Sequence, residues 1–228
     1  MKKYEYILID LDDTIFDFKK GERASIINTM NDIGYRMVDD DINTFSMINE
    51  KYFQMYANGE LSRDEFHHKR FEDFFLYLGL NNDPDTSDRM YMDELSMACE
   101  YVDGAVDFLN KINEKYKLYI ASNGMYDIQI SRLKKAGIYD MFDGVYVSSK
   151  IGANKPSKDF FEYIFKDLND YDKSKYLIIG DREDSDILGG IDSGIDTMYF
   201  NRKYKEIKLS PTYVINKLCE FDLNKLEK

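Results

Sequence analysis

Apolar runs of strand length alternate with amphipathic segments along most of this chain. Residues 4–9 (YEYILI) form the first run, and its aromatic and β-branched character is typical of a strand buried in a sheet. Later runs of the same character lie at 117–121, 144–148, 176–180, 196–200 and 212–215. The segments between them show helical spacing over about ten residues, and several end at a glycine. This alternation predicts an α/β fold with a doubly wound parallel sheet.

A long block near the start interrupts the alternation, because residues 17–97 contain no convincing strand pattern. Apolar residues recur at helical spacing in successive stretches of this block, and one stretch begins with a capping box formed by Ser62 and Glu65. Residues 81–88 have the composition of a polar turn before a last helix. We therefore predict two parts, an α/β core and an inserted all-helical cap. The core is predicted at residues 1–14 and 100–228, and the cap at residues 15–99.

Polar residues follow the predicted strands at the points where the strands end. They are Asp10, Asp12 and Thr14 after the first strand, Ser122 and Asn123 after the second, Lys155 after the third, and Asp181, Asp184 and Asp186 after the fourth. The carboxyl ends of parallel strands meet at one edge of a sheet, where ligands bind in open α/β folds. For the first stretch considered alone, an acidic turn that caps a helix explains the aspartates as well as a ligand-binding site does. The recurrence of polar residues at the other strand ends favours a binding site.

The residue types in this set suit the transfer of a phosphoryl group. Asp10, Asp12 and Asp181 supply the hard oxygen ligands that Mg²⁺ prefers. Lys155 can neutralise charge on a transferring phosphoryl group, and the Ser122 hydroxyl can donate a hydrogen bond to a phosphate oxygen. An aspartate can attack phosphorus to form an aspartyl-phosphate, and a second carboxylate two residues later can act as general acid and base. The pattern thus predicts a Mg²⁺-dependent phosphoryl-transfer site.

Four short motifs in this chain resemble those of the haloacid dehalogenase superfamily, in the same order and on corresponding predicted strands. They are Asp10-Leu11-Asp12-Asp13-Thr14, Ser122-Asn123-Gly124, Lys155-Pro156, and Gly180-Asp181 with Asp186. The resemblance covers essentially the whole chain. It implies a Rossmann-like core, a helical cap and a Mg²⁺-dependent phosphomonoesterase that works through an aspartyl-phosphate intermediate.

The resemblance also implies a role for each matching residue. In that family the first aspartate is the nucleophile and the aspartate two positions later is the general acid and base, which assigns these catalytic roles to Asp10 and Asp12. The phosphate-binding residues correspond to Ser122, Asn123 and Lys155. The metal ligands correspond to Asp10, Asp12, Asp181 and Asp186, where Asp12 contributes its backbone carbonyl. The implied cofactor is Mg²⁺.

Within the superfamily, three stretches are similar to the pyrimidine 5′-nucleotidase branch: residues 10–18, 122–124 and 211–215. This similarity implies a small phosphorylated metabolite as substrate, a nucleoside 5′-monophosphate. Phosphoglycolate or sugar-phosphate phosphatases and phosphomutases use the same core and stay open as alternatives, as does a catalytically silent protein that binds a phosphate ligand. Haloalkanoate dehalogenation is disfavoured, because the members of the superfamily that catalyse it lack the acid/base carboxylate that Asp12 provides. The sequence assigns no role to Arg182 or Glu183.

Charge and composition narrow the range of partners. The 43 acidic residues exceed the 31 basic ones, giving a formal net charge of −12, which argues against broad binding of nucleic acid or of an anionic membrane. Cys99 and Cys219 lie far apart without a pairing pattern and are predicted to be free thiols. The first residues do not resemble a signal peptide, and no apolar run approaches the ~20 residues that a membrane span needs. We expect a cytoplasmic protein that is a monomer or a weak homodimer.

Overall fold

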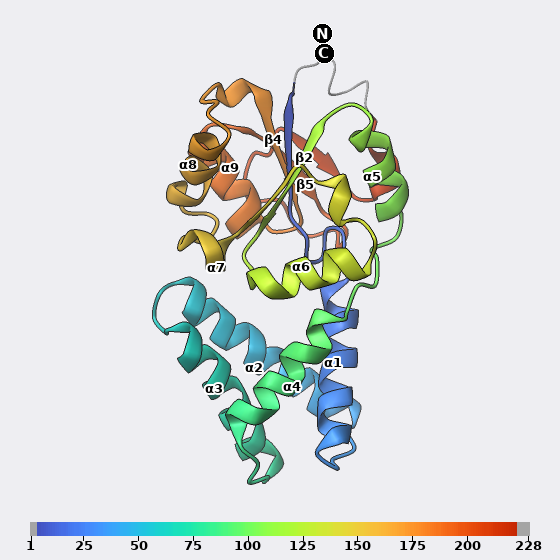
Figure 1. Ribbon diagram of the computed structural model, residues 1–228, viewed down its shortest axis with the longest axis vertical. Coiled ribbons are helices and arrows are strands. Elements are labelled where there is room, and N and C mark those ends of the chain that lie inside the picture. Colours follow the sequence, from blue (N-terminus) through green and yellow to red (C-terminus); the bar gives the residue numbers. More distant parts are fainter. Residues whose placement is uncertain (1–3, 223–228) are drawn as a thin grey trace. The chain divides into compact units, whose positions relative to one another are not determined.

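The computed structural model describes residues 4–222, so the ends of the predicted core, at 1–3 and 223–228, lie outside the described residues. The described strands form a 6-stranded parallel sheet in the order β3-β2-β1-β4-β5-β6 (Figure 1). They are β1 (Tyr6–Ile9), β2 (Lys117–Ser122), β3 (Gly144–Val147), β4 (Tyr176–Gly180), β5 (Asp196–Phe200) and β6 (Tyr213–Ile215). The predicted doubly wound α/β core is confirmed, and β1 lies between β2 and β4 near its centre.

Helices cover both faces of this sheet (Figure 1). Successive side chains of a strand point to opposite faces, so Ile7 and Ile9 of β1 pack into one apolar cluster and Tyr6 and Leu8 into another. The first cluster includes buried residues of α5 and α6, and the second includes those of α8. The helical segments of this part are α5 (Ala105–Asn113), α6 (Tyr126–Lys135), η1 (Tyr139–Met141), α7 (Ser148–Ile151), α8 (Lys158–Asp167), η2 (Lys173–Lys175), η3 (Glu183–Ile187), α9 (Leu188–Ser193) and η4 (Leu218–Glu220).

The chain divides into two compact units, a core of residues 1–18 and 99–228 and a cap of residues 19–98. The prediction placed the first boundary four residues earlier, between residues 14 and 15. The difference arises because Ile15 and Phe16 are fully buried in the apolar interior of the core, and Phe16 forms a β-bridge with Tyr101. The residues directly after the first motif thus belong to the core.

The cap, all of whose residues are described, contains helices and no strand. Its helices are α1 (Phe18–Asp32), α2 (Asp39–Ala57), α3 (Arg63–Leu78) and α4 (Pro84–Ser96). The predicted capping box begins α3, since Ser62 Oγ accepts a hydrogen bond from Glu65 N (3.3 Å) and Glu65 Oε2 accepts one from Ser62 N (2.8 Å). The predicted turn at 81–88 is wrong in its second half, because α4 begins at Pro84. Proline suits the first turn of a helix, where its missing N–H is not needed.

Buried charges accompany the aromatic packing inside the cap. A hydrogen-bonded group, which we call the cap cluster, contains three of these buried charges, one buried asparagine and one exposed lysine: Glu22, Arg70, Asp88, Asn49 and Lys19. Arg70 Nε donates to Asp88 Oδ1 (2.7 Å), and Arg70 Nη1 donates to Asn49 Oδ1 (2.9 Å). Asn49 Nδ2 donates to Glu22 Oε1 (2.8 Å), and Lys19 Nζ donates to Glu22 Oε2 (3.1 Å). Each charge in the group therefore has an oppositely charged or hydrogen-bonding partner.

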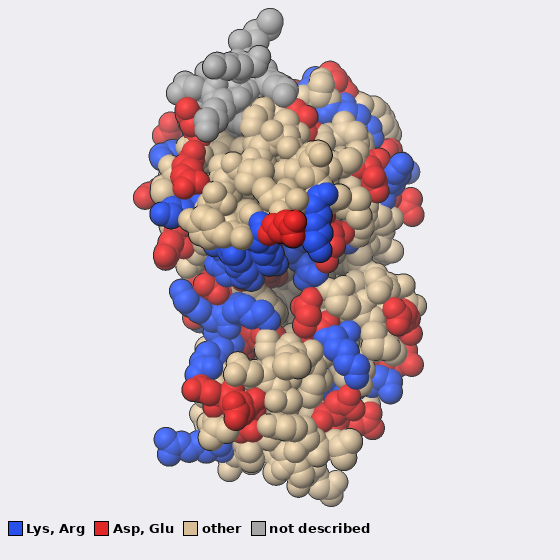
Figure 2. Space-filling view, turned by 180° about the vertical axis from the view of Figure 1, so that it is seen from behind, with Lys and Arg blue, Asp and Glu red and all other residues tan. Residues whose placement is uncertain are grey.

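Two further predictions concern thiols and membranes. Cys99 and Cys219 are both free cysteines, as predicted. Cys219 is exposed, and Cys99 is partly buried. Among the described helices, none combines the length and the apolar character that crossing a membrane requires. Acidic and basic side chains are spread over the face of the protein that Figure 2 shows.

Candidate active site

Asp10 lies at the carboxyl end of β1, the strand at the centre of the sheet. Its backbone N–H donates to Ile179 O of β4 (2.9 Å), which continues the pairing of the two strands by one residue. Ser122 ends the other neighbouring strand, β2, and Asp181 follows β4 directly. The parallel register thus brings residues that are far apart in sequence to one edge of the sheet, as predicted.

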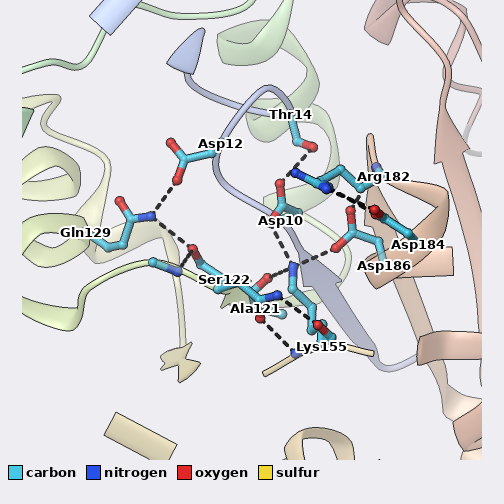
Figure 3. Close-up of polar contacts among 12 residues, drawn as sticks. Asp10, Asp12, Thr14, Ala121, Ser122, Gln129, Lys155, Arg182, Asp184 and Asp186 are labelled. Atoms are coloured by element: carbon cyan, nitrogen blue, oxygen red, sulfur yellow. Dashed lines mark hydrogen bonds and ion pairs between the residues drawn. The ribbon is translucent and has the colours of Figure 1, made fainter. Parts of the chain in front are cut away.

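The Lys155 ammonium holds several of these groups together (Figure 3). Lys155 is 3 % exposed, and its Nζ donates to Asp10 Oδ1 (2.8 Å) and to Asp186 Oδ1 (2.6 Å). It also donates to Ala121 O (2.5 Å), the carbonyl just before Ser122. Although burial lowers the pKa of Lys155, the carboxylates of Asp10 and Asp186 raise it above its ordinary value. The side chain is therefore a fixed positive charge beside Asp10.

Three carboxylates surround this single ammonium. Oxygen atoms of Asp10, Asp181 and Asp186 all lie within 4.8 Å of one another, and all three residues are buried. Burial raises the pKa of Asp10 to about 7, an effect that the Lys155 charge opposes and the Asp186 charge reinforces. Burial and the nearby Asp10 and Asp186 charges raise the pKa of Asp181 well above its usual range. We call these three residues the acid cluster; when all three are ionised, their negative charge exceeds what Lys155 can offset.

The donor set of the acid cluster fits a divalent cation. Among the described residues, Asp181 Oδ1 is a buried oxygen without a hydrogen-bond partner, and such an atom is costly unless an ion or water satisfies it. Carboxylate oxygens are the ligands that Mg²⁺ takes in proteins. The predicted ligands Asp10, Asp181 and Asp186 are thus brought together, whereas the Asp12 carboxylate is not part of the cluster. The Asp12 prediction concerned its backbone carbonyl and stays a prediction.

Local backbone geometry explains how Asp186 enters the site. Residues Glu183–Ile187 form a single π-helical turn, η3, of the kind that often occurs at functional sites. Asp186 Oδ2 accepts a hydrogen bond from Arg182 N (3.0 Å) across this turn. The carboxylate passes so close to Gly180 that a Cβ atom there would lie 2.2 Å from Asp186 Oδ2. Only glycine at position 180 leaves room for this placement of Asp186.

The predicted phosphate-binding residues of the second motif have different surroundings. Ser122 Oγ accepts hydrogen bonds from Gly124 N (3.1 Å) and from Gln129 Nε2 (2.9 Å). Asn123 Nδ2 donates to Lys155 O (2.9 Å), and Asn123 Oδ1 accepts from Lys155 N (2.8 Å). The Asn123 side chain therefore anchors the backbone of Lys155. Its contact with phosphate stays a prediction, and the anchoring role was not foreseen.

The Asp12 carboxylate is bound by two residues that sequence reasoning missed. Gln129 Nε2 donates to Asp12 Oδ2 (2.7 Å), and Arg132 Nη1 donates to Asp12 Oδ1 (2.5 Å). In Figure 3 the Asp12 side chain points toward Gln129, while Asp10 points toward Lys155. Both new residues lie on α6, the helix that follows the second motif. Polar residues on an amphipathic helix are by default assigned to its solvent face.

Arg182 and Glu183, which the sequence left without a role, have structural partners. Arg182 forms a bidentate ion pair with Asp184, through Nε (3.0 Å) and Nη2 (2.9 Å). Glu183 Oε1 accepts hydrogen bonds from the backbone N–H groups of Lys208 and Leu209, both at 2.9 Å. These contacts order the segment that carries Asp186 and tie it to the loop that follows β5.

The sequence profile of the haloacid dehalogenase-like hydrolase family matches residues 7–200 of this chain. The match spans most of the core and the whole of the cap, with all four motifs inside it. The chain therefore belongs to the haloacid dehalogenase-like hydrolases, and the predicted family, fold and class of enzyme are confirmed.

Three relatives are similar to this chain over nearly their full lengths. The structure of the HAD-hydrolase YfnB from Bacillus subtilis, determined bound to magnesium, has a TM-score of 0.89 and 31% identity, covering 96% of this chain and 97% of that chain. Pyrimidine 5′-nucleotidase YjjG of Escherichia coli is 29% identical over 222 residues, 96% of this chain and 97% of the relative. Pyrimidine 5′-nucleotidase PynA of Streptococcus pneumoniae is 29% identical over 232 residues, 99% of this chain and 98% of the relative.

Proposed function

We propose that this protein is a Mg²⁺-dependent phosphomonoesterase that hydrolyses nucleoside 5′-monophosphates, with pyrimidine nucleotides preferred. The observation that carries the proposal is the arrangement of the acid cluster around Lys155. It combines a carboxylate nucleophile, a buried cation and an oxygen that has no partner among the described residues in one site. This combination suits an anionic phosphoryl group bound together with a divalent metal ion.

Asp10 is the nucleophile in this proposal. Its carboxylate oxygen attacks the phosphorus atom, the bond from phosphorus to the nucleoside 5′-oxygen breaks, and an aspartyl-phosphate forms. Lys155 Nζ, 2.8 Å from Asp10 Oδ1, keeps the carboxylate oriented and offsets negative charge on the phosphoryl oxygens. Thr14 Oγ1 donates to Asp10 Oδ2 (3.2 Å) and fixes the second oxygen of the nucleophile.

Asp12 is the general acid and base. As the ester bond breaks, the Asp12 carboxyl donates its proton to the 5′-oxygen of the departing nucleoside. In the second half-reaction the Asp12 carboxylate accepts a proton from a water molecule whose oxygen attacks the phosphorus. Inorganic phosphate leaves, and Asp10 is restored. General acid–base help of this kind typically contributes about 10²- to 10⁴-fold in rate.

The remaining predicted residues bind the phosphate and the metal ion. Ser122, Asn123 and Lys155 are proposed for the phosphate. The side chains of Asp10, Asp181 and Asp186, with the backbone carbonyl of Asp12, would hold Mg²⁺. When bound, Mg²⁺ offsets the negative charge of these carboxylates and of the phosphoryl oxygens.

The substrate class rests on the relatives. Two of them are named pyrimidine 5′-nucleotidases, and this chain matches each over more than nine-tenths of both lengths. The acid cluster itself suits any phosphate monoester, including the sugar phosphates and phosphoglycolate that the sequence left open. A panel of substrates therefore tests the base-containing part of the proposal separately from the chemistry.

The test is a measurement of phosphate release from pyrimidine and purine nucleoside monophosphates, phosphoglycolate, sugar phosphates and p-nitrophenyl phosphate, with Mg²⁺ and with excess chelator. We expect the highest kcat/KM for pyrimidine 5′-monophosphates and no turnover in chelator. A higher kcat/KM for sugar phosphates or phosphoglycolate would replace the nucleotidase assignment. Absence of turnover on every substrate with Mg²⁺ present would support the silent phosphate-binding alternative instead.

Matched variants connect the activity to the site. Asp186→Asn should remove turnover, because Asp186 belongs to the acid cluster and contacts Lys155. Asp192→Asn makes the same chemical change six residues later, at an exposed side chain of α9, and should keep activity near the wild-type value. Equal losses in both variants would contradict the assignment of Asp186 to the site.

A further inference from the structure

We propose that Gln129 and Arg132 are positioning residues that hold the Asp12 carboxylate and the Ser122 hydroxyl in their reactive orientations. The inference rests on the proposed function, since it concerns how the general acid and base and the phosphate-binding serine are held. Neither residue belongs to the four motifs, and both are almost fully buried, with exposed fractions of 2% for Gln129 and 1% for Arg132.

Both oxygens of the Asp12 carboxylate are engaged by this pair. Arg132 Nη1 donates to Oδ1 at 2.5 Å, and Gln129 Nε2 donates to Oδ2 at 2.7 Å. The Asp12 side chain keeps 28% of its surface exposed, and each of its oxygens retains a second lone pair. The carboxylate is therefore fixed in rotation and yet accessible to a leaving group or a water molecule.

The orientation of the Gln129 amide follows from its own partners. Arg132 Nη1 donates to Gln129 Oε1 (2.9 Å), so the carbonyl end of the amide faces Arg132. The NH₂ end is thereby turned toward Asp12 Oδ2 and Ser122 Oγ, at 2.7 and 2.9 Å (Figure 3). An amide nitrogen carries two hydrogens, and these two contacts use both. Arg132 thus determines which way Gln129 points.

The same contact orients the Ser122 hydroxyl. A serine oxygen has two acceptor lone pairs and one donor hydrogen. Gly124 N (3.1 Å) and Gln129 Nε2 (2.9 Å) both donate to Ser122 Oγ. With its lone pairs occupied, Ser122 is left to act as a donor, which is what a phosphate oxygen requires.

Gly124 makes room for this arrangement. A Cβ atom at position 124 would lie 2.4 Å from Gln129 Nε2, so any larger residue would displace the amide from Asp12 and Ser122. The Arg132 guanidinium, for its part, packs over the Phe16 ring at 5.0 Å from the ring centroid. Packing and hydrogen bonding together hold the pair in one position.

The test compares two leaving groups in Arg132→Met. Asp12 protonates the departing oxygen of a nucleoside monophosphate, whereas p-nitrophenolate departs with little protonation. We expect kcat for uridine 5′-monophosphate to fall by about 10- to 100-fold, a part of the general acid–base contribution, and kcat for p-nitrophenyl phosphate to fall by less than about threefold. Lys135→Met removes one positive charge from the exposed face of the same helix and should change neither rate.

Gln129→Glu sharpens the test, because glutamate has the same shape but cannot donate toward Asp12 and Ser122. We expect kcat for uridine 5′-monophosphate to fall as in Arg132→Met. We also expect KM for both substrates to rise, because the Ser122 hydroxyl that is proposed to bind phosphate loses the donor that orients it. Arg132→Met should affect KM less. If Arg132→Met does not fold, Gln129→Glu carries the comparison of leaving groups, and Gly124→Ala displaces the same amide without changing a polar group.

A double-mutant cycle separates positioning from general loss of structure. Once Asp12 is replaced in Asp12→Asn, adding Arg132→Met should slow uridine 5′-monophosphate hydrolysis by no more than about twofold further, because residues that act through one another are non-additive. Full additivity, or equal losses on both leaving groups, would overturn the inference while leaving the phosphatase assignment intact. A wild-type protein inactive on both substrates would instead refute the proposed function.

Discussion

The buried charges of the core and those of the cap differ in how fully they are neutralised. In the cap cluster, the buried Arg70 and the exposed Lys19 balance two buried acidic residues, Glu22 and Asp88. In the core, the three carboxylates of the acid cluster share the single ammonium of Lys155. Burying an uncompensated charge costs far more free energy than burying a paired one.

The difference separates a structural group from a binding site. The cap cluster joins α1, α2, α3 and α4 through paired contacts and needs no additional ion to balance its charge. The acid cluster has excess negative charge when its carboxyls are ionised, and it contains an oxygen of Asp181 without a described partner. Its ionised state is unfavourable until a cation binds, which is the expected cost of a preformed metal and phosphate site.

The largest effect on turnover is expected from replacing the proposed nucleophile of the core, Asp10. Asp10→Asn should reduce phosphate release from nucleoside monophosphates to the background rate, because an amide is a poor nucleophile and a poorer metal ligand. Phosphate release at saturating substrate and Mg²⁺ measures this change, and circular dichroism checks that the variant is folded. Measurable turnover with trapped covalent phosphate on another residue would contradict the role of Asp10.

In the cap, removal of one partner should cost stability and leave the site intact. Arg70→Met leaves the buried Asp88 carboxylate without its guanidinium, and breaking such a pair typically costs about 3–5 kcal/mol. Urea unfolding measures the loss. The double variant Arg70→Met with Asp88→Leu removes both charges and should recover much of it. A loss below about 1 kcal/mol would indicate that the pair behaves like an exposed one.

The acid cluster should make stability depend on pH in a way that the cap cluster does not. Burial raises the pKa of Asp10 from 3.8 to about 7, so the folded protein binds more protons than the unfolded chain between these pH values. Without Mg²⁺, the contribution of Asp10 to the free energy of unfolding should therefore be greatest below pH 4. This contribution should fall as pH rises through about 7.

The size of this pH effect should be about 2 kcal/mol, measured by urea unfolding at pH 5 and pH 8 in chelator. Asp181→Asn removes one carboxylate and should flatten the slope, because the pKa of Asp181 is also raised. Asp192→Asn, at an exposed position of α9 outside the cluster, should not. A slope of the opposite sign, or one unchanged in Asp181→Asn, would mean that the cluster is not strained without metal.

The smallest effect is expected for the first turn of α3. Ser62→Ala removes the N-cap acceptor of Glu65 N and should lower the free energy of unfolding by about 1 kcal/mol. Ser62→Asp keeps an acceptor and should restore most of that loss. Turnover and Mg²⁺ affinity should be the same in all three proteins. A change in Mg²⁺ affinity would show that this turn of the cap is coupled to the core site.

The sequence alone determined the order of elements and the position of the main site residues. Buried parallel strands are read from continuous apolar runs, and their carboxyl ends share one edge of the sheet. Polar residues at those ends, including Asp10, Ser122 and Asp181, therefore had to converge. The helical character of the cap could also be predicted from the sequence, because its helices carry apolar residues at helical spacing and α3 begins with a capping box.

Tertiary structure decided which side chains meet beyond these ends. Gln129 and Arg132 lie 117 and 120 residues from Asp12 in sequence, and nothing in the local pattern of α6 distinguishes a buried arginine from an exposed one. The pairing of Asn123 with the Lys155 backbone and the inclusion of Phe16 in the core have the same origin. Periodicity reports which face of an element is buried, whereas the partner of a buried polar group depends on how distant elements pack.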